Sequence, residues 1–316
     1  IIIVGGLTRL TNSGLSITEW ELFKGILPPT NDASWVKYFD MYKKIPQFTL
    51  LNSEMTIEEF KIIFYWEYFH RVLARIIGLF FLLPFLYFYL SKKINNKYLT
   101  ICSIIFLLIL LQGLVGWYMV QSGLVNDVTV SHYRLSIHLI LAFFIISSIF
   151  WLLKNFSRNK NVIFFNFKKK NLPFQVLILL IFMQIILGAF VSGLDAGKIY
   201  QTWPLMGDSY LPNDLILNSY DQISNFNNHS LVQFYHRNLA YFIIFYVLVL
   251  SIYIYINRIR SLFNSLKQVV IVLIFQIMLG ILTLTSGLNI YLASAHQISS
   301  VLLVFSAINL YYCRTK

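Results

Sequence analysis

Seven long runs of apolar residues divide this chain, and each has about 20 residues, the length that a helix needs to cross roughly 30 Å of hydrocarbon. They lie at residues 66–90, 99–120, 133–153, 173–194, 231–256, 268–288 and 291–312. Hydrophobic residues make up 58% of the 316-residue chain and charged residues only 12%, which is far more apolar than a soluble domain of this size requires. The sequence therefore predicts an all-α integral membrane protein.

The chain opens inside a further apolar segment, IIIVGGLTRLT, which is too short to cross the hydrocarbon on its own. We interpret it as the end of an eighth transmembrane helix that is truncated in this chain. Before the second helix, Thr56-x-x-Glu59 predicts a capping box, so that helix is expected to begin outside the apolar run. Cys102 and Cys313 fall in apolar spans and predict no disulfide framework.

Basic residues are concentrated in alternate connections between the spans. The segments 91–98, 154–172 and 257–267 and the C-terminal tail hold lysines and arginines without any acid, whereas all 13 Asp and Glu residues lie elsewhere. Because positively charged loops stay on the cytoplasmic side, we expect these segments to face the cytoplasm. The net charge of +12 is thus a topology signal and predicts no affinity for nucleic acid.

The two halves of the chain repeat one another. Gln112, Gly116 and Ser122-Gly123-Leu124 recur as Gln276, Gly280 and Ser286-Gly287-Leu288, and YFHRVLA at 68–74 recurs as FYHRNLA at 234–240. An even number of helices in each copy gives both copies the same orientation in the membrane. We therefore predict eight transmembrane helices in two pseudo-symmetric four-helix bundles, formed by residues 1–156 and 157–316.

Each of the four helices that return from the outer side carries one histidine near its outer end. These are His70, His138, His236 and His296. A lone histidine in a membrane helix is more often a hydrogen-bonded core residue than a ligand, but an ionisable group in an apolar span is costly unless it is paired, ligated or lining a cavity. Two histidines at equal depth in each half have the arrangement that bis-imidazole ligation of a haem iron requires.

Other residues fit less readily into such sites. Zinc is the weaker candidate metal because no Cys, Asp or further His completes a tetrahedral shell. His132 and His229 have no counterpart in the other half and are expected on the surface. The helices that run outward end on Ser-Gly-Leu, and their glycines are expected in left-handed caps; they are Gly14, Gly123, Gly193 and Gly287. A second set is expected at helix contacts: Gly113, Gly116, Gly188 and Gly280.

Charged residues next to the histidines leave two interpretations open. Arg71 and Arg237 directly follow paired histidines, and they either snorkel to the outer interface or pair with haem propionates. Glu67 precedes His70 by three positions on the same helix face, and Gln233 stands in its place in the second half. Glu67 is either a solvated helix-start residue, or a general base or charge stabiliser that makes one haem reactive while the other assists.

Several segments together resemble the haem A synthase family of alpha-proteobacteria and mitochondria. They are GGLTRLTNSGLSITEW, EYFHR, QGLVGWYMVQSGL, LGAFVSGLDAGKIYQTWPLM, YHRNLAY and the terminal AHQ segment, and they extend over nearly the whole chain. The resemblance implies a membrane oxidoreductase that converts the C8 methyl group of haem O to the formyl group of haem A for terminal cytochrome oxidase. The conversion runs through successive hydroxylations followed by loss of water.

The resemblance also implies roles for individual residues. His70 and His138, with Arg71, would hold the substrate haem O, and Glu67 matches the family's essential glutamate. His236 and His296, with Arg237, would hold a haem b cofactor through its iron. Some members place paired cysteines in the outer loops, and because this chain has none there, no redox role of such a pair is transferred.

The resemblance places the protein in the cell inner membrane as a multi-pass protein with its haem sites toward the periplasmic face. Candidate partners are membrane lipid, the haem O synthase upstream, an electron-transfer partner and a second copy of the chain. Two alternatives stay open. A dihaem b-type electron-transfer protein would need the same four histidines but not Glu67, and a two-repeat transporter would place polar residues at mid-membrane.

Overall fold

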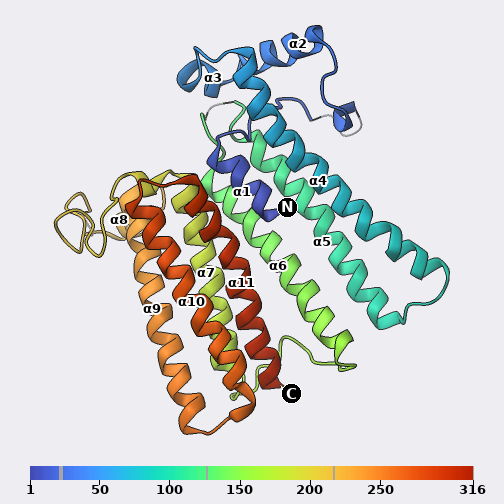
Figure 1. The fold of residues 1–316 in the computed structure, drawn as a ribbon, viewed down its shortest axis with the longest axis vertical. Helices are drawn as coiled ribbons and strands as arrows, with labels where there is room; N and C mark the ends of the chain where they lie inside the picture. The colour runs from blue at the N-terminus through green and yellow to red at the C-terminus, as the bar shows by residue number, and fades with distance from the viewer. Residues whose placement is uncertain (21–23, 126, 216–217, 316) are drawn as a thin grey trace. The chain divides into compact units, whose positions relative to one another are not determined.

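The computed structural model describes residues 1–20, 24–125, 127–215 and 218–315, and the elements within these ranges are α-helices and short 3-10 turns (Figure 1). Seven helices in these ranges are long and apolar enough to cross a membrane. They are α4 (Ile57–Leu90), α5 (Asn96–Gln121), α6 (His132–Ser157), α7 (Leu172–Gly193), α9 (His229–Ile256), α10 (Phe263–Thr285) and α11 (Ile290–Thr315). The predicted all-α membrane class is confirmed.

The first compact unit is Ile1–Ile145. In this unit the short helix α1 (Ile2–Leu10) packs against α4, and α4 also packs against α5. The start of α6 is tied to α5 through Arg134, whose Nη1 donates to the Tyr118 carbonyl at 2.8 Å. That α1 is the end of a longer spanning helix stays a prediction.

The second compact unit is Ile146–Lys316. Here α7 packs against α9, α9 against α10, α10 against α11, and α11 against α7. The four helices therefore form a closed bundle, which Figure 1 shows in colours from yellow-green to red. A short turn, η3 (Arg260–Leu262), precedes α10.

The helix α4 begins well before its apolar run, as its cap predicts. The Thr56 hydroxyl accepts a hydrogen bond from the Glu59 N–H at 3.3 Å, and the Glu59 carboxylate accepts one from the Thr56 N–H at 2.8 Å. These reciprocal bonds satisfy donors that an uncapped helix start leaves free. The predicted capping box is confirmed, and it extends α4 beyond the span as a single helix of 34 residues.

Aromatic side chains cover this extension of α4. The preceding segment folds into η1 (Lys24–Ile26), α2 (Asp32–Tyr42) and α3 (Pro46–Leu51). The core that joins the segment to α4 consists of Leu15, Trp35, Phe39, Tyr42, Ile45, Phe60, Phe64 and Val130. Large rings in edge contacts, such as Trp35 on Phe64 at 5.0 Å between centroids, stabilise this layer beyond the area that they bury.

Only one of the four glycines that were predicted to cap helices in the left-handed conformation has a positive φ. Gly287 is left-handed with φ of 72°, as predicted, but Gly14, Gly123 and Gly193 are not. The left-handed residues near the ends of α1 and α7 are instead Asn12 and Asp195. Gly123 is required for space, because a Cβ there would lie 2.7 Å from the side chain of Leu15.

In the second unit the connection from α7 to α9 contains η2 (Ala196–Lys198) and α8 (Tyr220–Ile223). The corresponding connection in the first unit is the segment between α1 and α4. We call the end of each unit at which these connections and the histidines lie the histidine end.

Candidate functional site

Each of the four predicted histidines packs against a glycine on the neighbouring helix. In every case a Cβ added to the glycine would lie closer to the imidazole Cε1 than an ordinary van der Waals contact allows. The distances are 3.0 Å for Gly5 and His70, 2.9 Å for Gly116 and His138, 3.2 Å for Gly188 and His236, and 2.9 Å for Gly280 and His296. The glycines therefore act as seats that let the half-buried rings lie between helices.

In three of these places a glutamine on the glycine's helix also contacts the histidine. Its amide Nε2 donates to the main-chain carbonyl of the histidine at 3.0 Å. The pairs are Gln112 with His138, Gln184 with His236, and Gln276 with His296. These bonds tie α5 to α6, α7 to α9, and α10 to α11 at the level of the histidines.

The histidines are arranged as two pairs, one in each unit. His70 and His138 lie within electrostatic range of each other, and so do His236 and His296. The Nδ1 atoms of His70, His138 and His236 are buried and have no hydrogen-bond partner in the described ranges. Buried ring nitrogens without partners are costly, and a bound metal would supply the partner that they lack.

The donor set of each pair fits haem iron better than zinc. In the described part of the chain no three His, Cys, Asp or Glu residues gather in a group that could hold a metal ion. Zinc takes at least three protein ligands, whereas haem iron takes its equatorial ligands from the porphyrin and needs only axial ones. The two histidines of each pair come from different helices, and their imidazoles would supply the protein ligands of such a group.

The two remaining histidines behave differently from each other. His229, the first residue of α9, is exposed as predicted. His132 was expected on the surface, and this prediction is wrong, because its side chain is only 7% exposed. It is the first residue of α6, and its ring lies 4.1 Å from that of Tyr133.

Glu67 is buried and tightly bonded. Its residue is 3% exposed, and α4 has begun ten positions earlier at Ile57, so the interpretation as a solvated helix-start residue is wrong. One carboxylate oxygen accepts hydrogen bonds from the Ser16 hydroxyl at 2.8 Å and the Ile17 N–H at 2.9 Å. The other accepts from Arg71, at 2.6 Å from Nη2 and 3.0 Å from Nε. Glu67 thus fastens the segment that follows α1 to α4.

The second unit has a similar arrangement, in which the neutral Gln233 takes the place of Glu67. Gln233 Nε2 donates to the Tyr200 carbonyl at 2.8 Å, and Arg237 Nη2 donates to the same oxygen at 2.9 Å. Arg237 Nη1 also donates to the carbonyls of Thr202 at 2.9 Å and Leu205 at 3.2 Å. We call each pair, Glu67 with Arg71 and Gln233 with Arg237, a loop clamp, because it holds the connection that follows the unit's first helix.

A buried hydroxyl and an acid support the clamp of the second unit. The Tyr200 and Ser230 hydroxyls each donate to the Asp214 carboxylate at 2.5 Å. Burial acts to raise the pKa of Asp214, but the bonds from Ser230 and Tyr200 outweigh it and hold the pKa below its ordinary value. The bond to Asp214, with burial second, raises the pKa of Tyr200. Asp214 therefore stays ionised and keeps the connection in place.

The two clamp arginines differ in their free donors. The Arg71 guanidinium is engaged by Glu67, and its Nη2 also donates to the Ile17 carbonyl at 2.9 Å. Arg237 has a buried Nε–H that lacks a hydrogen-bond partner among the described residues. Arg71 Nη1 makes a longer bond, at 3.4 Å to the Glu19 carbonyl. Since a guanidinium has five N–H donors, each arginine has a donor left for a further anionic group, and in Arg237 this includes the Nε–H.

Sequence reasoning missed part of this arrangement. It assigned Gly116, Gly188 and Gly280 to helix contacts, which is correct, but it did not connect them with the histidines. It also placed Gly113 at a contact, and this is wrong, because a Cβ on Gly113 would meet nothing within 4 Å. The repeated spacing Gln-x-x-x-Gly in three helices was the signal that could have identified the seats.

The glycine seats give a direct prediction. Gly116→Ala should lower the stability of the protein by about 1–3 kcal/mol, the usual effect of overpacking, because the new methyl group would lie 2.9 Å from the His138 ring. The measurement is thermal unfolding of the purified protein in detergent. Gly113→Ala, on the same helix but with nothing within 4 Å of the new Cβ, is the matched control and should raise stability by up to about 1 kcal/mol, because alanine favours the helix over glycine. Equal unfolding temperatures for both variants would contradict the role of Gly116.

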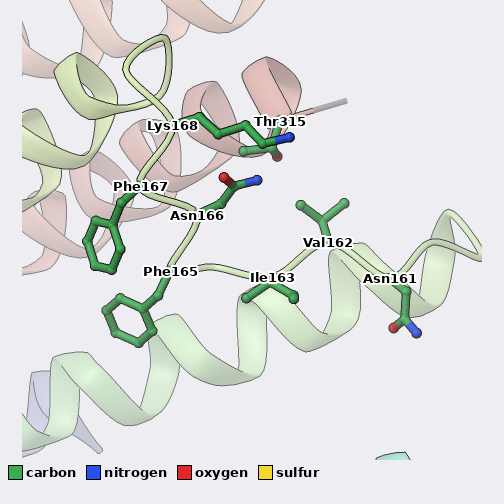
Figure 2. Close-up of a pocket in the computed structure, with 8 residues that line it drawn as sticks. All are labelled: Asn161, Val162, Ile163, Phe165, Asn166, Phe167, Lys168 and Thr315. Atoms are coloured by element: carbon green, nitrogen blue, oxygen red, sulfur yellow. The ribbon is translucent and has the colours of Figure 1, made fainter.

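A separate hollow lies away from the histidine ends. Figure 2 shows this cavity of about 640 Å³, which is lined by Asn161, Val162, Ile163, Phe165, Asn166, Phe167, Lys168 and Thr315. Its walls come from the connection between α6 and α7 and from the end of α11, and they include neither histidine nor acid. It therefore has no part in the histidine sites.

Comparisons with known proteins agree over nearly the whole chain. A family model described as cytochrome oxidase assembly protein matches residues 1–308. A protein named haem A synthase from Pelagibacter ubique is 48% identical over 97% of this chain and 90% of its own length. Proteins of the same name from Rhizobium rhizogenes and Flavobacterium psychrophilum are 41% and 37% identical; each match covers 96% of this chain, and 83% and 91% of the respective relative.

Proposed function

This chain belongs to the cytochrome oxidase assembly protein family, and on this premise we propose that it is a haem A synthase that oxidises the C8 methyl group of haem O to the formyl group of haem A. The observation that carries the proposal is the presence of one histidine pair in each unit, with every ring packed against a glycine of the neighbouring helix. Such pairs are the binding sites that an enzyme acting on one haem with the help of another needs. The relatives named haem A synthase support the same activity.

We assign a different haem to each unit. His70 and His138 would hold the substrate haem O, and His236 and His296 would hold haem b. When bound, haem b supplies one-electron transfer to or from the substrate site. The closed packing of α7, α9, α10 and α11 supports a permanent cofactor in the second unit.

The clamp arginines are the proposed partners of the haem propionates. Arg237 would bind a propionate of haem b, and its partner-free Nε–H supports this role, because a guanidinium meets a carboxylate through charge-assisted hydrogen bonds. Arg71 would bind a propionate of haem O while it shares its guanidinium with Glu67.

Glu67 is the proposed catalytic group of the substrate site. It lies three residues before His70, and so on the same side of α4. Its carboxylate can accept a proton or stabilise positive charge during oxidation of the methyl group. Gln233 cannot accept a proton at neutral pH, which supports the assignment of the chemistry to the first unit alone.

The proposed location is the cell inner membrane, with both histidine ends toward the periplasm. The lysine-rich and arginine-rich connections lie at the opposite ends of the helices from the histidines, which supports this orientation. The haem O synthase, an electron-transfer partner and a second copy of the chain are proposed partners that depend on this placement.

The decisive experiment is haem extraction from membranes that contain the protein beside a source of haem O. Reverse-phase chromatography should show haem A where membranes with the haem O source alone show haem O. A low-spin haem spectrum without any haem A, in a preparation of confirmed expression, would contradict the synthase and favour the dihaem electron-transfer protein.

A further inference from the structure

Three of the four glycines that pack against a histidine are preceded by a glutamine, and the fourth, Gly5, is not. In three helices a glutamine stands four residues before the seat glycine: Gln112 before Gly116, Gln184 before Gly188 and Gln276 before Gly280. Residues four apart are neighbours on a helix face, so this glutamine meets the same histidine as the glycine does. The position four residues before Gly5 is Ile1, the N-cap residue of α1, which has no hydrogen-bonding side chain.

The glutamine fixes the position of its histidine along the axis of the neighbouring helix. A main-chain carbonyl has two acceptor sites, and in the middle of a helix one of them is used by the N–H four residues on. The glutamine amide uses the other, at 3.0 Å in all three places. Because the bond goes to the main chain, it holds the histidine whichever ring atom binds a ligand.

The amide also approaches the ring, and in one place it is held in turn. Gln112 and Gln184 bring Nε2 to 3.3 Å and 3.4 Å from the Nε2 of His138 and His236. In the last pair the Oε1 of Gln276 accepts a hydrogen bond from the Ser299 hydroxyl, which orients the amide.

His70 packs against a glycine, Gly5, but no glutamine in the part of the chain that the structure describes is bonded to its main-chain carbonyl. Within the described ranges its Nδ1 is buried without a partner, and its main-chain carbonyl receives no bond from α1. Its contact with α1 is the close approach of the ring to Gly5. The first unit thus has one histidine held by a glutamine, His138, and one without such a bond, His70, whereas in the second unit both histidines are held.

We propose that the three glutamines are positioning residues that keep their histidines on haem iron, and that His70, which has none, is the exchangeable ligand of the substrate haem. This inference rests on the proposed function and adds to it how the two sites differ. A substrate haem must enter and leave at every turnover, so both of its histidine ligands have to release, and the histidine that is held less firmly releases first. A permanent cofactor has no such need, and both of its ligands are held.

Carbon monoxide is the probe that tests this difference. Ferrous haem with two imidazole ligands has no open position, so CO binds only after one imidazole has left, and the rate of CO binding measures ligand release. The second site is measured alone in full-length protein that carries His70→Ala and His138→Ala, and the first site alone in full-length protein that carries His236→Ala and His296→Ala. The haem of the first site should bind CO faster.

Gln184→Leu, made in the background that keeps only the second site, should raise the rate of CO binding about two- to tenfold, the effect of losing one neutral hydrogen bond. Gln175→Leu is the matched control, because Gln175 lies on the same helix but bonds to the Tyr311 hydroxyl instead of a histidine. It should leave the rate unchanged, even if it lowers thermal stability.

Ile1→Gln provides the reciprocal test in the background that keeps only the first site. It should slow CO binding by a similar factor, because it would place an amide four residues before Gly5, the position that Gln184 has relative to Gly188. The positioning role would be overturned if haem is bound but neither Gln184→Leu nor Ile1→Gln changes the rate of CO binding in its background. Failure of both backgrounds to bind low-spin haem would instead refute the proposed function itself.

Discussion

Replacing His236 or His296 by alanine should remove the low-spin haem of the second unit while the first unit keeps its own. Each imidazole is one of only two protein ligands proposed for that iron, and no other His, Cys, Asp or Glu in the described ranges gathers with the pair to take its place. Loss of an axial ligand should therefore exceed the roughly 10–100-fold loss of affinity typical of an outer-shell partner. The measurement is the haem content and the low-spin absorption and electron paramagnetic resonance signals of purified protein.

His229→Ala is the matched control for this experiment. His229 begins the same helix as His236 but is exposed, so its loss should leave haem content and spectrum unchanged. The corresponding variants of His70 and His138 should spare the haem of the second unit. A low-spin spectrum that survives unchanged in both His236→Ala and His296→Ala would show that the second pair does not bind iron.

Glu67→Gln should reduce haem A formation by at least about 100-fold, which is typical for the loss of an acid–base group, while haem incorporation survives. The variant keeps the shape of the side chain and can still accept from the Ile17 N–H, which is 2.9 Å from the carboxylate. It removes the charge that pairs with Arg71 and the basicity. Haem O or a partly oxidised hydroxymethyl form should accumulate in extracts from membranes that previously yielded haem A.

Ser16→Ala separates the two roles that Glu67 can have. It removes one bond of the loop clamp, from the Ser16 hydroxyl to the carboxylate at 2.8 Å, but leaves the acid and its charge. If Glu67 acts on the substrate haem, Ser16→Ala should change haem A formation by only a few fold. A loss as large as that of Glu67→Gln would mean that the carboxylate works by holding the segment after α1. Normal haem A formation by Glu67→Gln would rule out the acid–base role.

The parts of the structure that depend on local pattern could be predicted from the sequence. The spans follow from the length of the apolar runs, and the start of α4 follows from the spacing of Thr56 and Glu59. The histidine pairs follow from the internal repeat, because duplicated helices place equivalent residues at equivalent depth.

The rest depends on which faces of which helices meet, and a single sequence does not contain that directly. The bond of Glu67 to Ser16 joins residues 51 positions apart through a connection whose path has no local signal. The burial of His132 depends on the packing around the start of α6. The left-handed residues Asn12 and Asp195 show that the chain has more than one way to leave a helix, so the repeated Ser-Gly-Leu did not fix the turn.

The loop clamp allows the history of the two halves to be ordered. Arg71 and Arg237 make the same kind of bond to the connection after the first helix of their unit, so the simplest history places this bond in the ancestral half-length protein, before duplication. The acid at position 67 and the amide at position 233 then diverged afterwards. In this history the difference between acid and amide arose at a folding contact that both halves already had.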